Sequence, residues 1–127
     1  REIIRSHVLS FAALRSLRFD CETTEGNVAC RALLAALALN GLARSDAELL
    51  LRANCDLVES EPARVTLDKR YGEKAAFKAL TIDQAQELLS AALEHARTTA
   101  GVAWDGSVLA VTGNPEILRA AEDTRDE

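Results

Sequence analysis

The sequence has few of the features that secreted, membrane-spanning and disulfide-bonded proteins require. Its three cysteines, Cys21, Cys30 and Cys55, are an odd number without a C-x-x-C pair, and no secretory signal precedes them. The longest strongly apolar stretch, residues 32–39, is far shorter than the roughly 20 residues of a transmembrane helix. These absences predict a cytoplasmic protein with reduced thiols and no role in a membrane.

Methionine is missing altogether, and the sequence begins at Arg1 without an initiator residue. We therefore expect an excised or processed piece of a larger chain, with residues 1–127 forming a single domain. The hydrophobic content of 48% is sufficient for a core. The net charge of −5 argues against coating of nucleic acid by bulk charge, although it is compatible with a local basic face.

Signals of catalysis and of metal or cofactor binding are also missing. There is no G-x-S-x-G motif, the six glycines are scattered, and the cysteines and histidines lack the close spacing of zinc ligands. His7 and His95 are interpreted as structural or solvent-facing residues, and the carboxylates Asp83 and Glu87 as surface charge on a helix. We predict no enzymatic activity, no cofactor and no metal site.

Local patterns predict alternating strands and helices in the first half of the chain. They rest on β-branched residues, on helix caps and on a two-residue apolar period. The expected elements are a strand at 2–11, a short helical turn at 12–17, a helix at 28–40 with Asn27 as N-cap and Gly41 at its end, a helical turn after the capping box at 45–48, and a strand at 51–57.

The second half predicts a hairpin and the clearest helix of the chain. Tyr71 and Gly72 supply the loop between the two hairpin strands. The capping box that starts at Thr81 and the apolar repeat behind it are typical of an amphipathic helix. The expected elements are strands at 64–68 and 75–80, a helix at 82–98, a strand at 107–112 and a short last helix after Asn114-Pro115.

This order predicts an α+β fold of the ferredoxin-like or RRM-like kind, β-α-β-β-α-β, with a basic hairpin and an extra C-terminal helix. Both long helices should then cover one face of one antiparallel sheet. The helix at 28–40 has Arg31 as its only charged residue, so it should be buried on more than one side. We expect part of its apolar surface to need a partner outside this segment; that surface comprises Ala32, Leu33, Ala36, Leu37 and Leu39.

Positive charge is concentrated in the predicted hairpin of this acidic chain. Residues 64–78 hold five cationic and two anionic side chains around one tyrosine, and residues 1–19 hold four cationic and one anionic. Such segments can bind RNA through phosphates, with an aromatic ring available to stack on a base. The candidate RNA-binding residues are Arg64, Lys69, Arg70, Tyr71, Lys74, Lys78, Arg15 and Arg18. The alternative is a solvated hairpin and a solvated edge strand that carry no ligand.

Three segments resemble a known family. HVLSFAALRSLRF at 7–19, LLRANCDLV at 50–58 and DQAQELLSAALEHA at 83–96 are similar to the C-terminal part of the RAMP-superfamily backbone subunit of type I-U (I-G) Cascade, a CRISPR-associated effector of antiviral defence. The resemblance implies an RRM-like core that assembles along CRISPR RNA without cutting it. It also implies CRISPR RNA, further copies of the subunit and other Cascade subunits as partners. The larger N-terminal portion of that family lies outside this sequence.

A second function from a different class fits the same fold. The chain is then a ferredoxin-like interaction or dimerisation domain of a regulatory or metabolic protein, with no nucleic-acid role. The basic hairpin discriminates between the two, because a dimerisation domain has no need of the positive cluster at 64–78.

Overall fold

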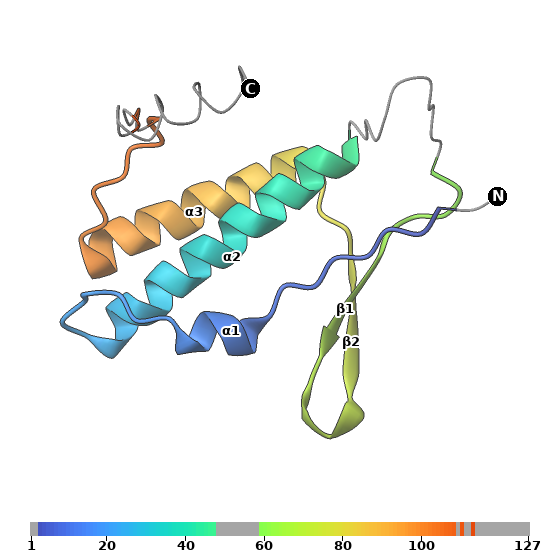
Figure 1. Ribbon diagram of the computed structural model, residues 1–127, viewed down its shortest axis with the longest axis horizontal. Coiled ribbons are helices and arrows are strands. Elements are labelled where there is room, and N and C mark those ends of the chain that lie inside the picture. Colours follow the sequence, from blue (N-terminus) through green and yellow to red (C-terminus); the bar gives the residue numbers. More distant parts are fainter. Residues whose placement is uncertain (1–2, 48–58, 109, 111–112, 114–127) are drawn as a thin grey trace, which may run out of the picture.

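The computed structural model describes residues 3–47, 59–108, 110 and 113 of the chain. Two long helices lie side by side, and a β-hairpin extends away from them (Figure 1). In chain order the elements are α1 (Phe11–Ser16), α2 (Thr24–Ala47), β1 (Arg64–Asp68), the short 3-10 turn η1 (Arg70–Gly72), β2 (Lys74–Lys78) and α3 (Ile82–Ala100). The described chain therefore combines three helices with a two-stranded antiparallel sheet, which agrees with the predicted α+β class.

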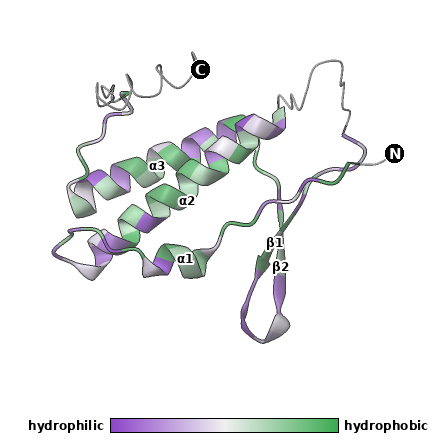
Figure 2. Ribbon diagram, in the orientation of Figure 1, coloured by the Kyte–Doolittle hydropathy of each residue, from purple (hydrophilic) through white to green (hydrophobic). Residues whose placement is uncertain are grey.

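Helix α3 forms as its sequence predicts. The Thr81 hydroxyl accepts a hydrogen bond from the Gln84 backbone N–H (3.2 Å), and the Gln84 side chain accepts one from the Thr81 N–H (3.1 Å). This capping box satisfies two of the N–H groups at the helix start. Gly101 ends the helix with a φ of 66°, in the left-handed region that favours glycine. Hydrophilic and hydrophobic residues are mixed along α3, whereas α2 is hydrophobic over most of its length (Figure 2).

The core lies between α2 and α3. Ala29 of α2 and Ala96 of α3 are both fully buried, and Leu33 packs beside them. Small side chains at these positions allow the two helix backbones to approach closely. Partly buried apolar side chains pack against them, namely Leu89, Ala92, Leu93 and Val102.

A polar contact fixes how the two helices align. Asn40 is buried, with 6% of its surface exposed, and its side-chain N–H donates to the Gln86 amide oxygen (3.3 Å). Arg44 donates to the same Gln86 oxygen (2.9 Å) and to the Asn40 amide oxygen (3.0 Å). Because buried amides need hydrogen-bond partners, these contacts favour one alignment of α2 on α3.

Helix α2 is longer at both ends than the sequence predicts. It begins at Thr24, where the Thr23 hydroxyl accepts from the Gly26 N–H (3.0 Å), so Thr23 takes the capping role assigned to Asn27. At the other end the helix continues through Gly41 to Ala47. The predicted stop at Gly41 and the separate turn at 45–48 are therefore wrong over the described residues. Asn40 and Arg44 contact α3 on either side of Gly41, and these contacts stabilise the helix across this position.

The apolar stretch at 32–39, from which no role in a membrane is predicted, is part of a longer helix. α2 has 24 residues and is long and apolar enough, by length and composition, to cross a membrane. The core helix of a soluble protein meets the same test. In this chain one side of α2 is buried against α3.

The predicted strand at 2–11 is wrong for the residues that the structure describes. Residues 3–10 form no strand, and Val8 is 92% exposed. Ser10 then caps α1, its hydroxyl accepting from the Ala13 N–H (3.2 Å). An ion pair between Arg5 and Asp46 connects this extended segment to the end of α2. β-branched residues favour a strand only when a partner strand is available.

The remaining strand predictions have mixed outcomes. The hairpin is confirmed, with its second strand at Lys74–Lys78 instead of 75–80. Ser107, Val108 and Ala110 are not in a strand, and the other residues of the predicted strand 107–112 lie outside the described part. The predicted strand at 51–57 and the last helix after Asn114-Pro115 also lie outside it.

The expected packing of both helices on one face of a sheet is not what the described residues form. α2 and α3 pack on each other, and most hairpin residues are exposed. On α2, Leu33 and Ala36 are buried, Leu39 is half-buried, and Ala32 and Leu37 are exposed. Apolar surface therefore remains on α2, as expected, and its partner stays a prediction.

Candidate nucleic-acid interface

The β1–β2 hairpin has one charged face and one apolar face. Paired residues of an antiparallel sheet share a face, and successive pairs alternate between faces. Arg64 pairs with Lys78 and Asp68 with Lys74, with the pair Thr66 and Ala76 between them. The intervening pairs, Val65 with Phe77 and Leu67 with Ala75, lie on the opposite face. The strand register thus places three cationic residues on the face opposite the apolar pairs.

The hairpin tip presents a tyrosine in an unusual backbone conformation. Tyr71 has a φ of 62° and Gly72 a φ of 78°, as the two central residues of a type I′ turn require. The Lys69 N–H donates to the Glu73 carbonyl (2.8 Å) below this turn. Glycine adopts such a φ freely, but for tyrosine it costs energy. The Tyr71 side chain is 99% exposed, so it receives no contact in return.

Two of the five hairpin cations form ion pairs. Arg64 lies 2.5 Å from the Glu61 carboxylate, and Lys74 lies 3.5 Å from Asp68. Both pairs are exposed, and exposed pairs contribute little free energy, so a polyanion can compete for these cations. The other three cations, Lys69, Arg70 and Lys78, form no ion pair with the described part of the chain.

All three lysines of the chain lie in this hairpin, whereas its arginines are spread along the sequence. The six predicted hairpin residues are therefore together on one projecting element. Its charge is positive although the chain as a whole is acidic.

Arg15 and Arg18 are not part of the hairpin cluster. Arg15 lies in α1, and the Arg18 guanidinium, just after it, donates to the Arg15 carbonyl (3.1 Å). Helix α1 contacts α2 and lies apart from the hairpin tip (Figure 1). These two arginines therefore form a basic position that is separate from the hairpin cluster.

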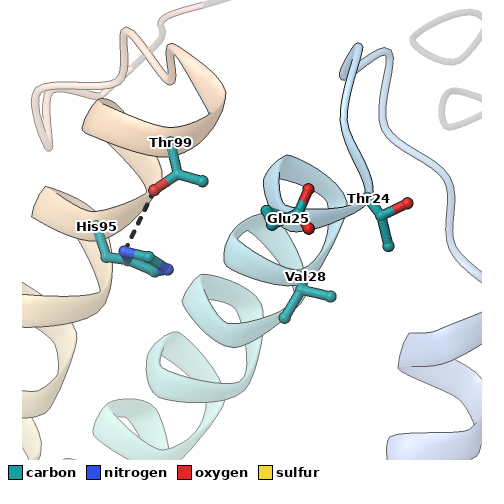
Figure 3. Close-up of a pocket in the computed structure, with 5 residues that line it drawn as sticks. All are labelled: Thr24, Glu25, Val28, His95 and Thr99. Atoms are coloured by element: carbon teal, nitrogen blue, oxygen red, sulfur yellow. Dashed lines mark hydrogen bonds between the residues drawn. The ribbon is translucent and has the colours of Figure 1, made fainter.

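A shallow hollow of about 300 Å³ lies between the start of α2 and the end of α3. Figure 3 shows the five residues that line it. His95 and Thr99 line it from α3, with Thr24, Glu25 and Val28 on α2. The His95 Nδ1 lies 3.3 Å from the Thr99 hydroxyl. The lining contains no cysteine or serine, and its two hydroxyl groups are those of Thr24 and Thr99. Among the described residues there is no group of three or more potential metal ligands.

Comparisons of the chain with known protein families, with curated proteins and with solved structures give no match.

Sequence reasoning found the cations of the hairpin but missed its apolar face as a surface. The register places Val65 and Leu67 of β1 on this face together with Phe77 of β2, which is 57% exposed. The signal for this face is the strict alternation of polar and apolar residues in β1, whereas β2 has three consecutive apolar residues, Ala75, Ala76 and Phe77. Sequence reasoning also missed the proximity of Cys21 and Cys30, for which a spacing of nine residues across a loop gives no signal.

Proposed function

We propose that this chain is a non-catalytic RNA-binding segment of a larger subunit, with the hairpin as the element that contacts RNA phosphates. The observation that supports it most is the tip of the hairpin. There Lys69 and Arg70 directly precede a fully exposed Tyr71 in an acidic chain. Flexible cations neutralise phosphates, and an exposed ring can stack on an unpaired base.

The resemblance of three segments to a Cascade backbone subunit makes this proposal specific. In that form the RNA is CRISPR RNA, the partners are further copies and other Cascade subunits, and the core is ferredoxin-like or RRM-like, β-α-β-β-α-β. The protein then acts as a scaffold in the cytoplasm. Sequence selection would come from pairing of the guide with its target and not from protein contacts to bases.

The test is RNA binding by the chain over a salt series. The variant combines Lys69→Ala, Arg70→Ala and Lys74→Ala, and fluorescence anisotropy follows a labelled single-stranded RNA. Each lost phosphate contact lowers the slope of log affinity against log salt by about 0.7, so the slope should fall by roughly 2. The matched control exchanges cation for cation, with Lys69→Arg, Arg70→Lys and Lys74→Arg, and should keep the slope. An unchanged slope in the alanine variant would contradict the proposal.

Lysine acetylation provides a second test that needs no mutation. Because every lysine of the chain lies in the hairpin, an amine-specific reagent labels only this element and the terminal amine. Bound RNA should protect Lys69, Lys74 and Lys78, measured by mass spectrometry of the labelled peptides. Equal labelling with and without RNA, at RNA concentrations that saturate binding, would place the RNA elsewhere on the chain.

The second candidate function, an interaction or dimerisation domain, is favoured by a different observation. The apolar face of the hairpin is exposed at Val65 and Phe77, and exposed apolar surface is typical of protein contact sites. Phe77→Ser should then convert an oligomer to a monomer in sedimentation experiments, while RNA binding stays absent in all variants. A monomeric unmodified chain would reject this candidate.

A further inference from the structure

Two of the three cysteines lie close together although nine residues separate them. The sulfur atoms of Cys21 and Cys30 are 3.8 Å apart. Cys21 is in the loop before α2 and is half-buried, and Cys30 is in the second turn of α2 and is buried. A disulfide bond has an S–S distance of about 2.05 Å. The two sulfurs therefore need only a small further approach to reach bonding distance.

Hydrogen bonds hold the loop in this position on α2. The Asn27 amide oxygen accepts from the Phe19 N–H (2.9 Å), and its N–H group donates to the Thr23 carbonyl (3.0 Å). The Arg31 guanidinium donates twice to the Leu17 carbonyl, at 2.8 and 3.2 Å. These contacts come from the residues on either side of Cys30. They orient the loop so that the two thiols face each other without a covalent bond.

We propose that Cys21 and Cys30 form a reversible intrachain disulfide by exchange with a small-molecule disulfide of the glutathione class, RSSR. This differs from the expectation that the thiols stay reduced. The inference is independent of RNA binding. The disulfide would attach the loop between α1 and α2 covalently to α2.

The exchange has two steps. The Cys21 thiolate attacks one sulfur of RSSR, forms a Cys21–S–S–R bond and releases RS⁻. The Cys30 thiolate then attacks the Cys21 sulfur, the Cys21–Cys30 bond forms, and the second RS⁻ leaves. The two thiol protons pass to the two RS⁻ ions through water, and RSSR receives the two electrons that the cysteines lose.

The environments of the thiols assign the order of attack. Cys21 is more accessible than Cys30, so it meets the external disulfide first. Burial raises the pKa of the Cys30 thiol, and its contact with Cys21 raises it further. Cys30 is therefore the resolving residue, which attacks only a sulfur that is already beside it.

A peptide map of the oxidised protein tests the pairing directly. Trypsin cleaves after Arg18 and Arg31, so one peptide, 19–31, contains both cysteines, and Cys55 is in another, 53–64. After treatment of the folded chain with oxidised glutathione, peptide 19–31 should lose the mass of two hydrogen atoms. A cross-linked pair of peptides 19–31 and 53–64, or glutathione on both Cys21 and Cys30 with no internal bond, would overturn the proposal.

The second measurement is the equilibrium constant of disulfide formation in glutathione buffers, folded and in urea. The Cys55→Ser variant removes the third thiol. Because the fold holds the sulfurs together, the constant should be about tenfold or more larger in the folded chain than in urea. A smaller ratio would mean that the fold does not favour the bond. Cys30→Ser in the same background should instead retain glutathione on Cys21, and an unreactive Cys21 would contradict the order of attack.

Discussion

The Asn40–Gln86 contact is expected to stabilise the alignment of α2 on α3, and Asn40→Ala tests it. The change removes the donation to Gln86 (3.3 Å) and the acceptance from Arg44 (3.0 Å). Each such hydrogen bond contributes about 1 kcal/mol net. Alanine has a higher helix propensity, which returns roughly 0.5 kcal/mol. The Gln86 oxygen still accepts from Arg44 (2.9 Å), so it is not left without a partner. We expect a net loss of about 1–2 kcal/mol.

For each hydrogen bond removed, Gln86→Ala should lower the free energy of unfolding more than Asn40→Ala does. It leaves the Asn40 N–H group without its acceptor at a position that is only 6% exposed. An unsatisfied buried donor costs about 1–3 kcal/mol. The double variant does not add this penalty, because both partners are then absent. The double-mutant cycle should therefore give a coupling free energy of about 0.5–1.5 kcal/mol between these two residues.

Urea unfolding followed by circular dichroism at the helix band measures these differences. A loss of about 1.5 kcal/mol shifts the midpoint by roughly 1 M, since urea slopes for small proteins are about 1–3 kcal/mol per M. Ser90→Ala on α3 is the matched control, because its contact with Gln86 is long, at 3.5 Å, and exposed. Coupling within a few tenths of a kcal/mol of zero would refute the argument that this polar contact fixes the helix pair.

Three further predictions concern single turns. Tyr71→Asn should leave the hairpin folded, because asparagine tolerates a positive φ. The loss of stacking should weaken RNA binding by about 1–3 kcal/mol in anisotropy titrations, whereas Tyr71→Phe should bind as the unmodified chain does. Gly101→Ala should destabilise α3 by about 1 kcal/mol in urea unfolding, because its φ of 66° strains alanine while its surroundings have space for a Cβ. Hydrogen bonds from Ser107 lower the pKa of Asp105, so this turn is stabilised above the ordinary carboxyl pKa and loses that stability as the pH falls through the lowered value. Trp104, which donates to the Ser107 carbonyl (3.3 Å), should report this in an acid fluorescence titration, and Asp105→Asn should abolish the transition.

Local signals were sufficient for α3 and for the hairpin. The capping box at Thr81 and the glycine at 101 are both within one turn of the helix ends that they determine. The residues of the hairpin strands alternate between two faces, and the turn that joins the strands contains Gly72. The cations of the candidate site could be predicted for the same reason, because they follow each other in one local element.

The errors occur where local signals compete with distant contacts. Gly41 is a plausible helix end by itself, but Asn40 and Arg44 on either side of it are held by Gln86, more than forty residues later. The β-branched segment near Ile3 and Ile4 has no partner strand among the described residues and stays exposed. No sequence pattern contains these partners, so the boundaries of α2 and the state of the N-terminal segment could not be predicted from it.

The separation of the hairpin from the helix pair determines what a functional experiment can show. The core residues Ala29, Leu33 and Ala96 all belong to α2 and α3, whereas the loop cations and Tyr71 are exposed on the hairpin. Exposed substitutions away from caps and cores usually change stability by less than about 0.5 kcal/mol. Changes at Lys69 and Arg70 should therefore alter RNA binding while the unfolding midpoint stays the same. A loss of RNA binding that is accompanied by a lower midpoint would instead indicate that the hairpin supports the fold.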